Sequence, residues 1–341
     1  MSQTPTLGWG IVAPGAISRT FAESLRRHRA GRVVAVTGRS LERSREFARE
    51  FGGSAVDTLE QLLADPAVQA VYVATPHPQH FEPAHKVLEA GKALLCEKPM
   101  TVSVADTEAL VAASRRLRVP LAEAYMYRCH PQVAWVQEVV RSGQLGKPVL
   151  LEAPFCFAAP FDPKGRLFAP ELGGGGIYDV GGYPVSLALA IGSAASGSLV
   201  LPTLEAAWAE RAPTGVDAHA TATLRFPGGF VAKVSCAVVR DLGQVATLHL
   251  EHGRVVLETP YLVDNQRHAV AAKVRIARDG RPEEVRVLSA PVDNYAAEAL
   301  ALAAMVAAPQ KPLEPPAPLV GHAESLALAR LLDAWRRAAL A

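Results

Sequence analysis

The chain has 341 residues, of which 50% are hydrophobic, 20% charged and 6% aromatic. This length exceeds what one hydrophobic core usually organises, so we expect two domains, and the apolar fraction excludes a disordered chain. The 35 Lys and Arg residues balance 33 Asp and Glu residues without any block of like charge. This balance excludes binding to nucleic acid or to a membrane surface that is driven mainly by charge.

Cysteine usage and the N-terminal residues bear on the compartment. The four cysteines, Cys96, Cys129, Cys156 and Cys236, lie far apart and form no Cys-x-x-Cys pair. This spacing argues against a disulfide scaffold and against a cysteine-built zinc site. Residues Met1–Gly10 carry no Lys or Arg ahead of an apolar stretch. We therefore expect no signal peptide and a cytoplasmic location.

The first third of the chain alternates β-branched runs with amphipathic helical patterns. Helix starts are marked by Ser40, by Thr58 with Gln61, and by Ser103 with Asp106. Strands that alternate with helices of this length predict an α/β fold with a doubly wound parallel sheet of the Rossmann type. The expected strands are Leu7–Val12, Val33–Thr37, Ala70–Ala74, Ala93–Cys96 and Leu121–Ala124, and the expected helices are Ile17–Arg29, Leu41–Phe51, Leu59–Ala64, His80–Ala90 and Ser103–Arg118.

The pattern changes after about Ala124. From Thr203 onward, successive strands with tight turns predict a large, mostly antiparallel sheet in a C-terminal α+β domain. We expect an NADP-binding domain over residues 1–124 and a substrate-binding domain over residues 125–341. The other expected elements of the second domain are a strand at Val149–Phe157 and helices at Gln132–Arg141, Tyr178–Ile191, Tyr295–Val306 and Ala323–Leu340.

Two features of the second domain concern its surroundings. An antiparallel sheet with one uncovered face is a ready subunit interface, so we expect a homodimer or homotetramer formed through this sheet. The segment Val180–Leu204 carries no charge and is long enough to span a membrane, but glycines, serines and prolines interrupt it repeatedly. We interpret it as a buried helix followed by a loop.

The loop after the first strand stands where a doubly wound sheet binds the pyrophosphate of a dinucleotide. The usual G-x-G-x-x-G/A pattern is incomplete, because Ala13 replaces the first glycine and Ser18 the last, which leaves Gly15 at the point of closest approach. The alternative is a tight strand-to-helix turn without a ligand. The candidate cofactor residues here are Ala13, Pro14, Gly15, Ala16 and Ile17.

The end of the second strand bears on the choice between NAD and NADP. NAD-specific sheets place an Asp or Glu there, but this chain has Thr37-Gly38-Arg39-Ser40 followed by Arg43. A guanidinium and a hydroxyl bind a phosphate, which a carboxylate would repel. We therefore favour NADP over NAD through Arg39, Ser40 and Arg43. The alternative is that these arginines form a solvated helix face.

Two further strand ends carry polar side chains toward the crevice where such sheets bind ligands. Thr75, Pro76, His77 and His80 follow the third expected strand, and Glu97 with Lys98 follows the fourth. The two histidines lack a further ligand pattern for a metal, so we expect them to line the nicotinamide side of the cleft. Lys98 has the alternative of an ordinary surface charge.

Several motifs in the same order resemble those of the glucose–fructose oxidoreductase/inositol dehydrogenase (Gfo/Idh/MocA) family. The resemblance covers roughly the first 190 residues. The motifs that carry it are Trp9-Gly10-Ile11-Val12, His77-Pro78-Gln79-His80, Glu97-Lys98-Pro99, Glu123-Ala124-Tyr125-Met126-Tyr127-Arg128-Cys129-His130-Pro131 and Gly174-Gly175-Gly176-Ile177-Tyr178-Asp179-Val180-Gly181-Gly182-Tyr183.

Tyr183 narrows the resemblance to one branch. Many members place a proton-transferring histidine four residues after the aspartate, whereas this chain has Asp179 followed by Tyr183. The Asp–Tyr form is similar to dimeric dihydrodiol dehydrogenases, NADP-dependent D-xylose dehydrogenases and glucose–fructose oxidoreductase. Use of NADP by that branch agrees with the residues that follow the second strand.

The resemblance implies that Lys98, Asp179 and Tyr183 are catalytic. Alcohol oxidation needs hydride transfer to the nicotinamide and removal of the hydroxyl proton, and the protein supplies the second. The pKa of tyrosine is normally about 10, and a nearby ammonium lowers it. We therefore expect Lys98 close to Tyr183, with Asp179 orienting the lysine or the substrate hydroxyl.

Tyr183 and Asp179 also have structural alternatives. Tyr183 could be a buried helix residue whose hydroxyl binds a carbonyl, and Asp179 a charge that the dipole favours at a helix N-terminus. Tyr127, Arg128 and Arg166 are tentative contacts for substrate hydroxyls, and Arg128 has the structural alternative of pairing with Glu123.

We expect an enzyme that transfers a hydride between NADP and a hydroxyl-bearing carbon of a sugar or cyclic polyol. Aldoses such as D-xylose or glucose are the first candidates, and a trans-dihydrodiol is the enzymatic alternative. The alternative from another class is a regulator that binds NADP without catalysis. The presence of Lys98, Asp179 and Tyr183 argues against the regulator, since a sensor needs none of them.

Overall fold

The computed structural model describes residues 6–263, 267–308 and 314–341. These residues cluster into two compact units, one made of Met1–Cys129 and Val292–Ser325, the other of His130–Pro291 and Leu326–Ala341. The expected ranges 1–124 and 125–341 lack the return of Val292–Ser325 to the first unit. The return depends on contacts between distant parts of the chain, which local patterns do not reveal. The segment Met1–Pro5, part of the stretch used to judge a signal peptide, lies outside the described residues.

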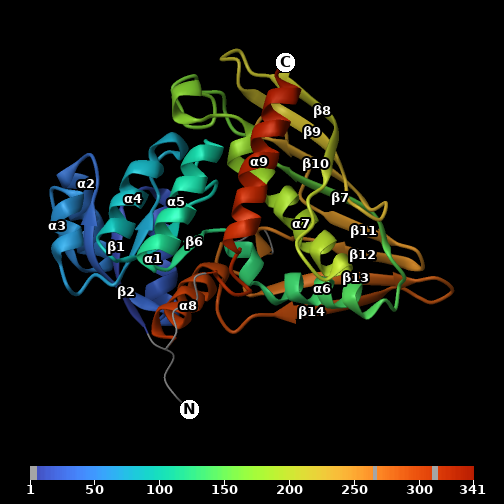
Figure 1. Ribbon diagram of the computed structural model, residues 1–341, viewed down its shortest axis with the longest axis horizontal. Helices are drawn as coiled ribbons and strands as arrows, with labels where there is room; N and C mark the ends of the chain where they lie inside the picture. Colours follow the sequence, from blue (N-terminus) through green and yellow to red (C-terminus); the bar gives the residue numbers. More distant parts are fainter. Residues whose placement is uncertain (1–5, 264–266, 309–313) are drawn as a thin grey trace. The chain divides into compact units, whose positions relative to one another are not determined.

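The first unit contains a six-stranded sheet in the order β3-β2-β1-β4-β5-β6 among the described residues (Figure 1). All of its pairs are parallel, which confirms the predicted Rossmann-type α/β architecture. Its strands are β1 (Leu7–Val12), β2 (Gly31–Thr37), β3 (Ser54–Ala55), β4 (Ala70–Val73), β5 (Ala93–Cys96) and β6 (Leu121–Glu123); its helices are α1 (Ala16–His28), α2 (Leu41–Phe51), α3 (Leu59–Ala64), α4 (Phe81–Glu89), α5 (Val104–Leu117) and α8 (Asn294–Ala307), with short 3₁₀ turns η1 (His77–Gln79) and η2 (Met126–Cys129).

The local signals in the sequence explain most of these elements. β1, β4 and β5 are buried along their whole length, as expected for strands covered on both faces. The hydroxyls of Ser40 and Ser103 accept hydrogen bonds from the amides three residues later, and Thr58 with Gln61 forms a complete capping box. The two-residue strand β3 was not expected, because it is too short to carry a pattern.

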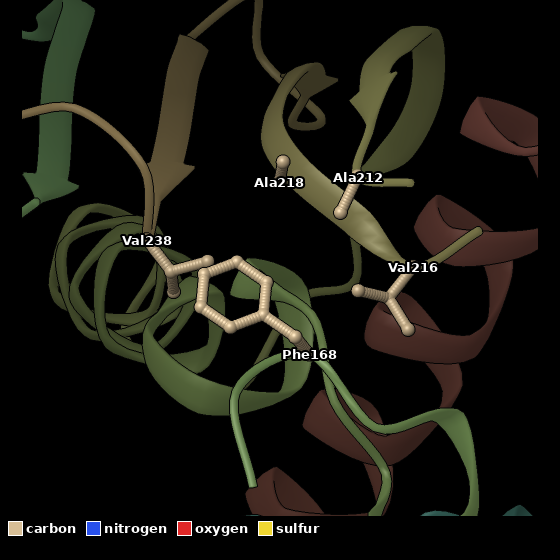
Figure 2. Packing of buried hydrophobic residues seen from close by; sticks show 5 residues of the cluster. All are labelled: Phe168, Ala212, Val216, Ala218 and Val238. Atoms are coloured by element: carbon tan, nitrogen blue, oxygen red, sulfur yellow. The ribbon is translucent and has the colours of Figure 1, made fainter. Parts of the chain in front are cut away.

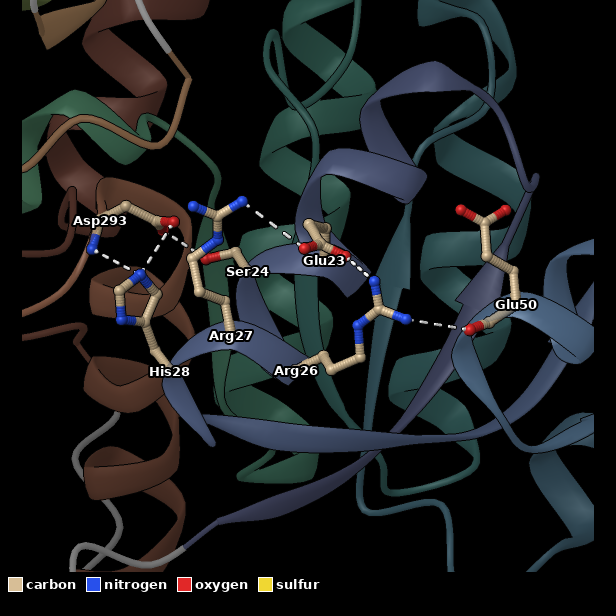
Figure 3. Close-up of polar contacts among 7 residues, drawn as sticks. All are labelled: Glu23, Ser24, Arg26, Arg27, His28, Glu50 and Asp293. Atoms are coloured by element: carbon tan, nitrogen blue, oxygen red, sulfur yellow. Dashed lines mark hydrogen bonds and ion pairs between the residues drawn. The ribbon is translucent and has the colours of Figure 1, made fainter.

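Asp293 attaches the returning helix α8 to helix α1 (Figure 3). Its carboxylate is fully buried and accepts hydrogen bonds from the Ser24 hydroxyl and from the amide of Ala296 in the first turn of the helix. Nε2 of His28 lies 3.1 Å from the other carboxylate oxygen. One aspartate therefore caps α8 and binds two side chains of α1.

The second unit contains an eight-stranded sheet among the described residues, in the order β14-β13-β12-β11-β7-β10-β9-β8 (Figure 1). Only the β7–β10 pair is parallel, so the predicted mostly antiparallel sheet is confirmed. The strands are β7 (Pro148–Cys156), β8 (Thr203–Arg211), β9 (Asp217–Arg225), β10 (Val231–Ala237), β11 (Ala246–Leu250), β12 (Gly253–Leu257), β13 (Ala271–Arg278) and β14 (Glu284–Ser289); the helical segments are α6 (Pro131–Ser142), η3 (Pro170–Leu172), η4 (Ile177–Gly181), α7 (Gly182–Ser196) and α9 (His322–Ala339), the last from Leu326 onward.

One face of this sheet is covered and the other is open. Residues along β9, β10 and β13 alternate between buried and more exposed positions. Helix α7 packs on β7 and β10, and Nε1 of Trp335 in α9 donates a hydrogen bond to the carbonyl of Thr221. The edge strand β14 is almost wholly exposed. The helices thus bury one face only.

Near the start of β9, a small apolar cluster holds the loop that follows β7. Phe168 of this loop is 1% exposed and packs with Val216, Ala218, Ala212 and Val238 (Figure 2). The ring excludes water from the strand ends around it. The loop that leads to η4 and α7 is therefore anchored in the interior.

The uncharged segment Val180–Leu204 forms the end of η4 and the helix α7, which ends at Ser196 and is followed by an irregular stretch. Most of α7 is buried within the second unit, as predicted. No helix in the described parts of the chain is both long and apolar enough to cross a membrane.

Candidate active site

The loop between β1 and α1 retains the shape of a dinucleotide-binding turn without the usual glycines. Ala13 has φ of +69°, in the left-handed region that favours glycine, and its amide donates to the carbonyl of Thr37. The hydroxyl of Ser18 donates to the carbonyl of Ala13 at 2.8 Å. The turn is therefore preserved although both glycines are replaced. Ala13 adopts a glycine-like conformation, and the hydroxyl of Ser18 donates to its carbonyl.

The space around this loop fits a pyrophosphate. A Cβ added to Gly15 would have no neighbour closer than the Ala13 oxygen at 4.0 Å, so the backbone is open to close approach. No side chain caps α1, and no acidic residue lies in its first turn. The amides of Ala16 and Ile17, whose side chains are exposed and half-buried, begin the helix and stand ready for an anion. Pro14 packs against Gly38, where a Cβ would lie 2.6 Å from the proline Cδ.

The end of β2 presents positive charge and no carboxylate. Arg39 and Arg43 are exposed, and neither forms an ion pair with any described residue. The hydroxyl of Ser40 accepts from the amide of Arg43 at 3.3 Å, so it both caps α2 and remains at the mouth of the loop. These residues fit a phosphate group on the adenosine ribose.

The loop after β4 is tied to the turn after β5 by His80. This residue is fully buried, with Nδ1 at 2.9 Å from the carbonyl of Pro99 and Nε2 at 2.8 Å from the carbonyl of Thr75. Burial lowers the pKa of His80, so the neutral ring donates to one of the two carbonyls. His77 packs edge-on against this ring, and Pro76 begins the short turn η1. His80 is thus a link between strand ends.

Lys98 lies half-buried at the carboxyl end of β5, as the sequence predicts. The carboxylate of Glu97 accepts from the amide of Lys98 at 3.2 Å and from the buried hydroxyl of Tyr72. Glu123 accepts from the amide of Met100 at 2.8 Å, and burial raises the pKa of Glu123 to about 7. Buried acids therefore hold both sides of the Glu97–Met100 turn.

Glu298 is a functional candidate that the sequence reasoning missed. It is 1% exposed, and neither carboxyl oxygen has a hydrogen-bond partner among the described residues. Burial and then the charges of Glu97 and Asp293 raise the pKa of Glu298, which favours the neutral acid beside the turn. The available signal was that Glu298 is the single charged residue in the apolar pattern of Asn294–Ala307.

Two of the three tentative substrate contacts lie away from solvent in the first unit. Tyr127 is fully buried, with its ring 6.4 Å from that of Tyr125. The guanidinium of Arg128 forms an ion pair with Glu324, and both side chains are largely buried. Arg128 therefore forms its ion pair with Glu324 and not with Glu123. The sequence does not predict this partner, because the two residues lie far apart in the chain.

Asp179 occupies a π turn at the start of α7. The segment Ile177–Gly181 has π geometry, and the amide of Asp179 donates to the carbonyl of Gly175 at 3.1 Å. Such wide turns recur at functional sites. Nη1 of Arg166 lies 2.6 Å from Oδ1 of Asp179, and the arginine side chain is 61% exposed against 7% for the aspartate. Arg166, the third candidate for substrate contact, thus forms an ion pair with Asp179, one of the predicted catalytic residues.

Tyr183 lies in an aromatic cluster of the second unit. It is 6% exposed, with its ring 5.1 Å from that of Phe155 and 5.6 Å from that of Tyr261. Phe155 and Tyr261 stack at 5.0 Å. Neither partner was expected from the sequence, because their positions on separate strands and loops carry no local signal. Lys98 belongs to the first unit, and Asp179 with Tyr183 belongs to the second.

The remaining side chains of interest show no other chemistry. Within the described residues, no group of three His, Cys, Asp or Glu side chains is placed to hold a metal ion. All four cysteines are free. Burial raises the pKa of Cys129 above its usual range, so its thiol is a poor nucleophile.

Comparison with known proteins agrees with this geometry. Residues 7–125 match the family profile described as "Oxidoreductase family, NAD-binding Rossmann fold", and residues 133–256 match the GFO/IDH/MocA C-terminal domain. Trans-1,2-dihydrobenzene-1,2-diol dehydrogenase of Mus musculus is 35% identical over 243 residues, 70% of this chain and 71% of that protein. dTDP-3,4-didehydro-2,6-dideoxy-alpha-D-glucose 3-reductase of Saccharopolyspora spinosa is 33% identical over 79% of this chain and 77% of its own length.

A solved structure extends the likeness over almost the whole chain. The 3-ketoreductase KijD10 of Actinomadura kijaniata, in complex with NADP and TDP-benzene, superposes with a TM-score of 0.84 at 25% identity, covering 98% of each chain. The two domain profiles, the relatives and the fold therefore all point to the same family of oxidoreductases. The chain belongs to the Gfo/Idh/MocA family of oxidoreductases.

Proposed function

We propose that this oxidoreductase transfers a hydride between NADP and a hydroxyl-bearing carbon of a sugar or cyclic polyol. One observation carries the proposal. Asp179 lies on a π turn four residues before Tyr183, which is 6% exposed within an aromatic cluster. The relatives whose names state a substrate act on a dihydrodiol or a deoxysugar. Sugars and cyclic diols share a ring with neighbouring hydroxyls.

The choice of NADP rests on residues of the first unit. The open backbone at Gly15 and the uncapped start of α1 suit the pyrophosphate, while Arg39, Ser40 and Arg43 suit a ribose phosphate. Bound NADP supplies the hydride acceptor or donor. The proposed residues along the nicotinamide side are Thr75, Pro76 and His77. The buried side chains of His80 and Glu97 support the two strand-end turns that His80 links.

Tyr183 is the proposed proton-transfer residue. As the phenolate, it accepts the substrate hydroxyl proton during oxidation, and as the phenol, it donates a proton during reduction. The ammonium of Lys98 favours the phenolate and is the proposed partner that makes it available near neutral pH. Asp179 holds a negative charge beside the reacting hydroxyl, and Arg166 fixes that carboxylate at 2.6 Å.

The aromatic cluster favours a substrate ring with an apolar face. Phe155 and Tyr183 keep 8% and 6% of their surface exposed, whereas Tyr261 is fully buried against them. Both an aldose and a cyclohexadiene diol present C–H groups that pack on aromatic rings. The exposed guanidinium of Arg166 adds a donor for hydroxyl groups. Aldoses such as D-xylose or glucose are the first candidates, and a trans-dihydrodiol is the second.

The experiment follows reduced nicotinamide by absorbance while the protein is mixed with NADP and a panel of aldoses, cyclic polyols and trans-dihydrodiols. Tyr183→Phe is expected to lower kcat by about 10²–10⁴-fold without changing NADP affinity. Tyr178→Phe is the matched control, because it removes a hydroxyl from the same segment and leaves the proposed proton path intact. Full turnover by Tyr183→Phe contradicts the mechanism, and tight NADP binding without turnover of any substrate favours the regulator.

The open face of the large sheet is the proposed subunit interface. Val149, Trp208, Val285 and Val287 are between 50% and 61% exposed, and a shallow hollow of about 470 Å³ lies over β7 to β10 beside Trp208. Apolar side chains on an uncovered antiparallel sheet suit a second copy of the same sheet. Light scattering is expected to give a homodimer or tetramer that Trp208→Lys shifts toward the monomer.

A cytoplasmic location is also proposed. The four free cysteines include three that are buried, which suits a reducing compartment.

A further inference from the structure

At the start of the segment that carries Asp179 and Tyr183, a backbone amide donates to a buried carboxylate of a different element. Asp217, the first residue of β9, is fully buried. One of its oxygens, Oδ2, accepts a hydrogen bond from the amide of Ile177 at 2.6 Å, and the nearby amide of Gly176 also favours the charged carboxylate. These amides precede the first complete turn and have no carbonyl partner within it. Asp217 therefore caps the turn from the strand side.

The glycines before the turn are shaped around this carboxylate. Gly175 has φ of +114°, and a Cβ there would lie 2.3 Å from Oδ1 of Asp217. At Gly176, a Cβ would meet the Sγ of Cys236 at 3.3 Å. A side chain at Gly175 would displace the aspartate, so the glycine run and Asp217 form one fitted contact.

Water cannot replace this carboxylate without a rearrangement. Val216 and Ala218, on either side of Asp217, are at most 2% exposed and belong to the apolar cluster around Phe168 (Figure 2). Removal of the acceptor would leave the amide of Ile177 without this partner, and an unmade buried hydrogen bond is costly. The cluster therefore makes the geometry of the turn depend on Asp217.

The cost of burying the carboxylate indicates that it does more than fill space. Burial raises the pKa of Asp217 to about 6, against the opposite effects of the two amides and of Arg336. The groups that face it electrostatically are Arg336 of α9, Tyr178 of η4 and Cys236 of β10. A carboxylate buried at such a cost is expected where function requires a defined geometry.

We propose that Asp217 is a positioning residue for the reaction: its carboxylate orients the turn Gly176–Gly181, and thereby the side chains of Asp179 and Tyr183. It touches neither substrate nor cofactor in this role. The inference rests on the proposed function, because it presumes that Asp179 and Tyr183 perform the chemistry.

The test compares Asp217→Ala with Val216→Ala, a neighbouring substitution that removes buried apolar contact and leaves the carboxylate. Misplacing reacting groups by about 1 Å can cost about 100-fold. Asp217→Ala is therefore expected to lower kcat by about 10- to 100-fold with unchanged NADP affinity. Val216→Ala is expected to lower thermal stability while kcat stays near that of the wild type. An equal effect of both variants on kcat overturns the proposal.

Asp217→Asn keeps one acceptor oxygen and guards against failure of the alanine variant to fold. Amide hydrogen exchange at Gly176 and Ile177 reports the turn directly, without an activity assay. In Asp217→Asn, we expect faster exchange at Ile177 together with a loss of kcat smaller than that of the alanine variant. Faster exchange at Ile177 with a wild-type kcat overturns the positioning role.

The two proposals fail in different ways. Full activity of Tyr183→Phe refutes the proposed function whatever Asp217 does. An inactive Tyr183→Phe together with a fully active Asp217→Ala keeps the proposed function and refutes the positioning role.

Discussion

Asp293→Ala tests how the returning helix α8 is held to the nucleotide-binding unit. The substitution removes the N-cap of α8, whose oxygen accepts from the amide of Ala296 at 3.0 Å, and the acceptor for the Ser24 hydroxyl. It also removes the carboxylate 3.1 Å from Nε2 of His28. Figure 3 shows the contacts of Asp293 with Ser24 and His28.

The magnitude follows from these contacts. Loss of a helix N-cap costs about 1 kcal/mol. Ser24 is fully buried and would be left without an acceptor, which adds about 1–3 kcal/mol. His28 is partly exposed and contributes least, since water can replace its partner. We expect a loss of about 2–4 kcal/mol in the free energy of unfolding, or about 5–15 °C in Tm.

Ser103→Ala is the matched control, because Ser103 caps α5 without the additional buried contacts. Chemical denaturation followed by circular dichroism should give a loss of about 1 kcal/mol for Ser103→Ala and two to four times that for Asp293→Ala. Asp293→Asn keeps a capping oxygen and should fall between them. Equal losses for the two alanine variants would refute the reasoning that the buried network adds to the cap.

Three further predictions concern other sites. Glu298→Met should stabilise the protein by about 1–3 kcal/mol at pH 8, because the buried wild-type carboxyl resists the ionisation that it undergoes in the unfolded chain. Because folding raises the pKa of Glu298, its contribution to stability is complete below the unfolded pKa and is lost as pH rises; a gain in denaturation midpoint that fails to shrink toward pH 4 would contradict this. Arg39→Ala should weaken NADP binding by about 10- to 100-fold and leave NAD binding unchanged, and equal losses in calorimetric titrations with the two cofactors would exclude a phosphate contact. Gly192→Ala places a Cβ 2.5 Å from Cε1 of Phe226 and should cost about 1–3 kcal/mol in thermal unfolding, whereas a neutral result would show that the ring moves freely.

Much of the first unit could be predicted from short-range patterns. Alternating strands and helices, the caps at Ser40, Thr58 and Ser103, and the burial of whole strands are local consequences of side-chain chemistry. The position of Lys98 at a strand end also follows from the pattern, since a short strand and the proline after it mark the turn.

The partners of the candidate site residues could not be predicted in the same way. Arg166 meets Asp179 from a loop without a distinguishing pattern, and Arg128 pairs with Glu324 across 196 residues of sequence. The four-residue spacing of Asp179 and Tyr183 is that of neighbours on one face of an α-helix, but the structure has a π turn at Asp179. A turn of this kind depends on the glycines and on Asp217, which the sequence separates.

The sequence by itself determined the class of the two sheets and predicted the nucleotide-binding loop and the Asp179–Tyr183 pair, because each depends on residues close together in the chain or on an ordered set of motifs. The tertiary structure alone decided which groups the buried acids face: Glu298 faces Glu97, Asp293 binds Ser24 of α1 as well as capping α8, and Asp217 accepts from the amide of Ile177. Apart from the local cap at Ala296, each of these contacts joins residues that lie far apart in the chain. A buried carboxylate acquires its role from the amides and charges that the fold brings to it, and no local pattern encodes those neighbours.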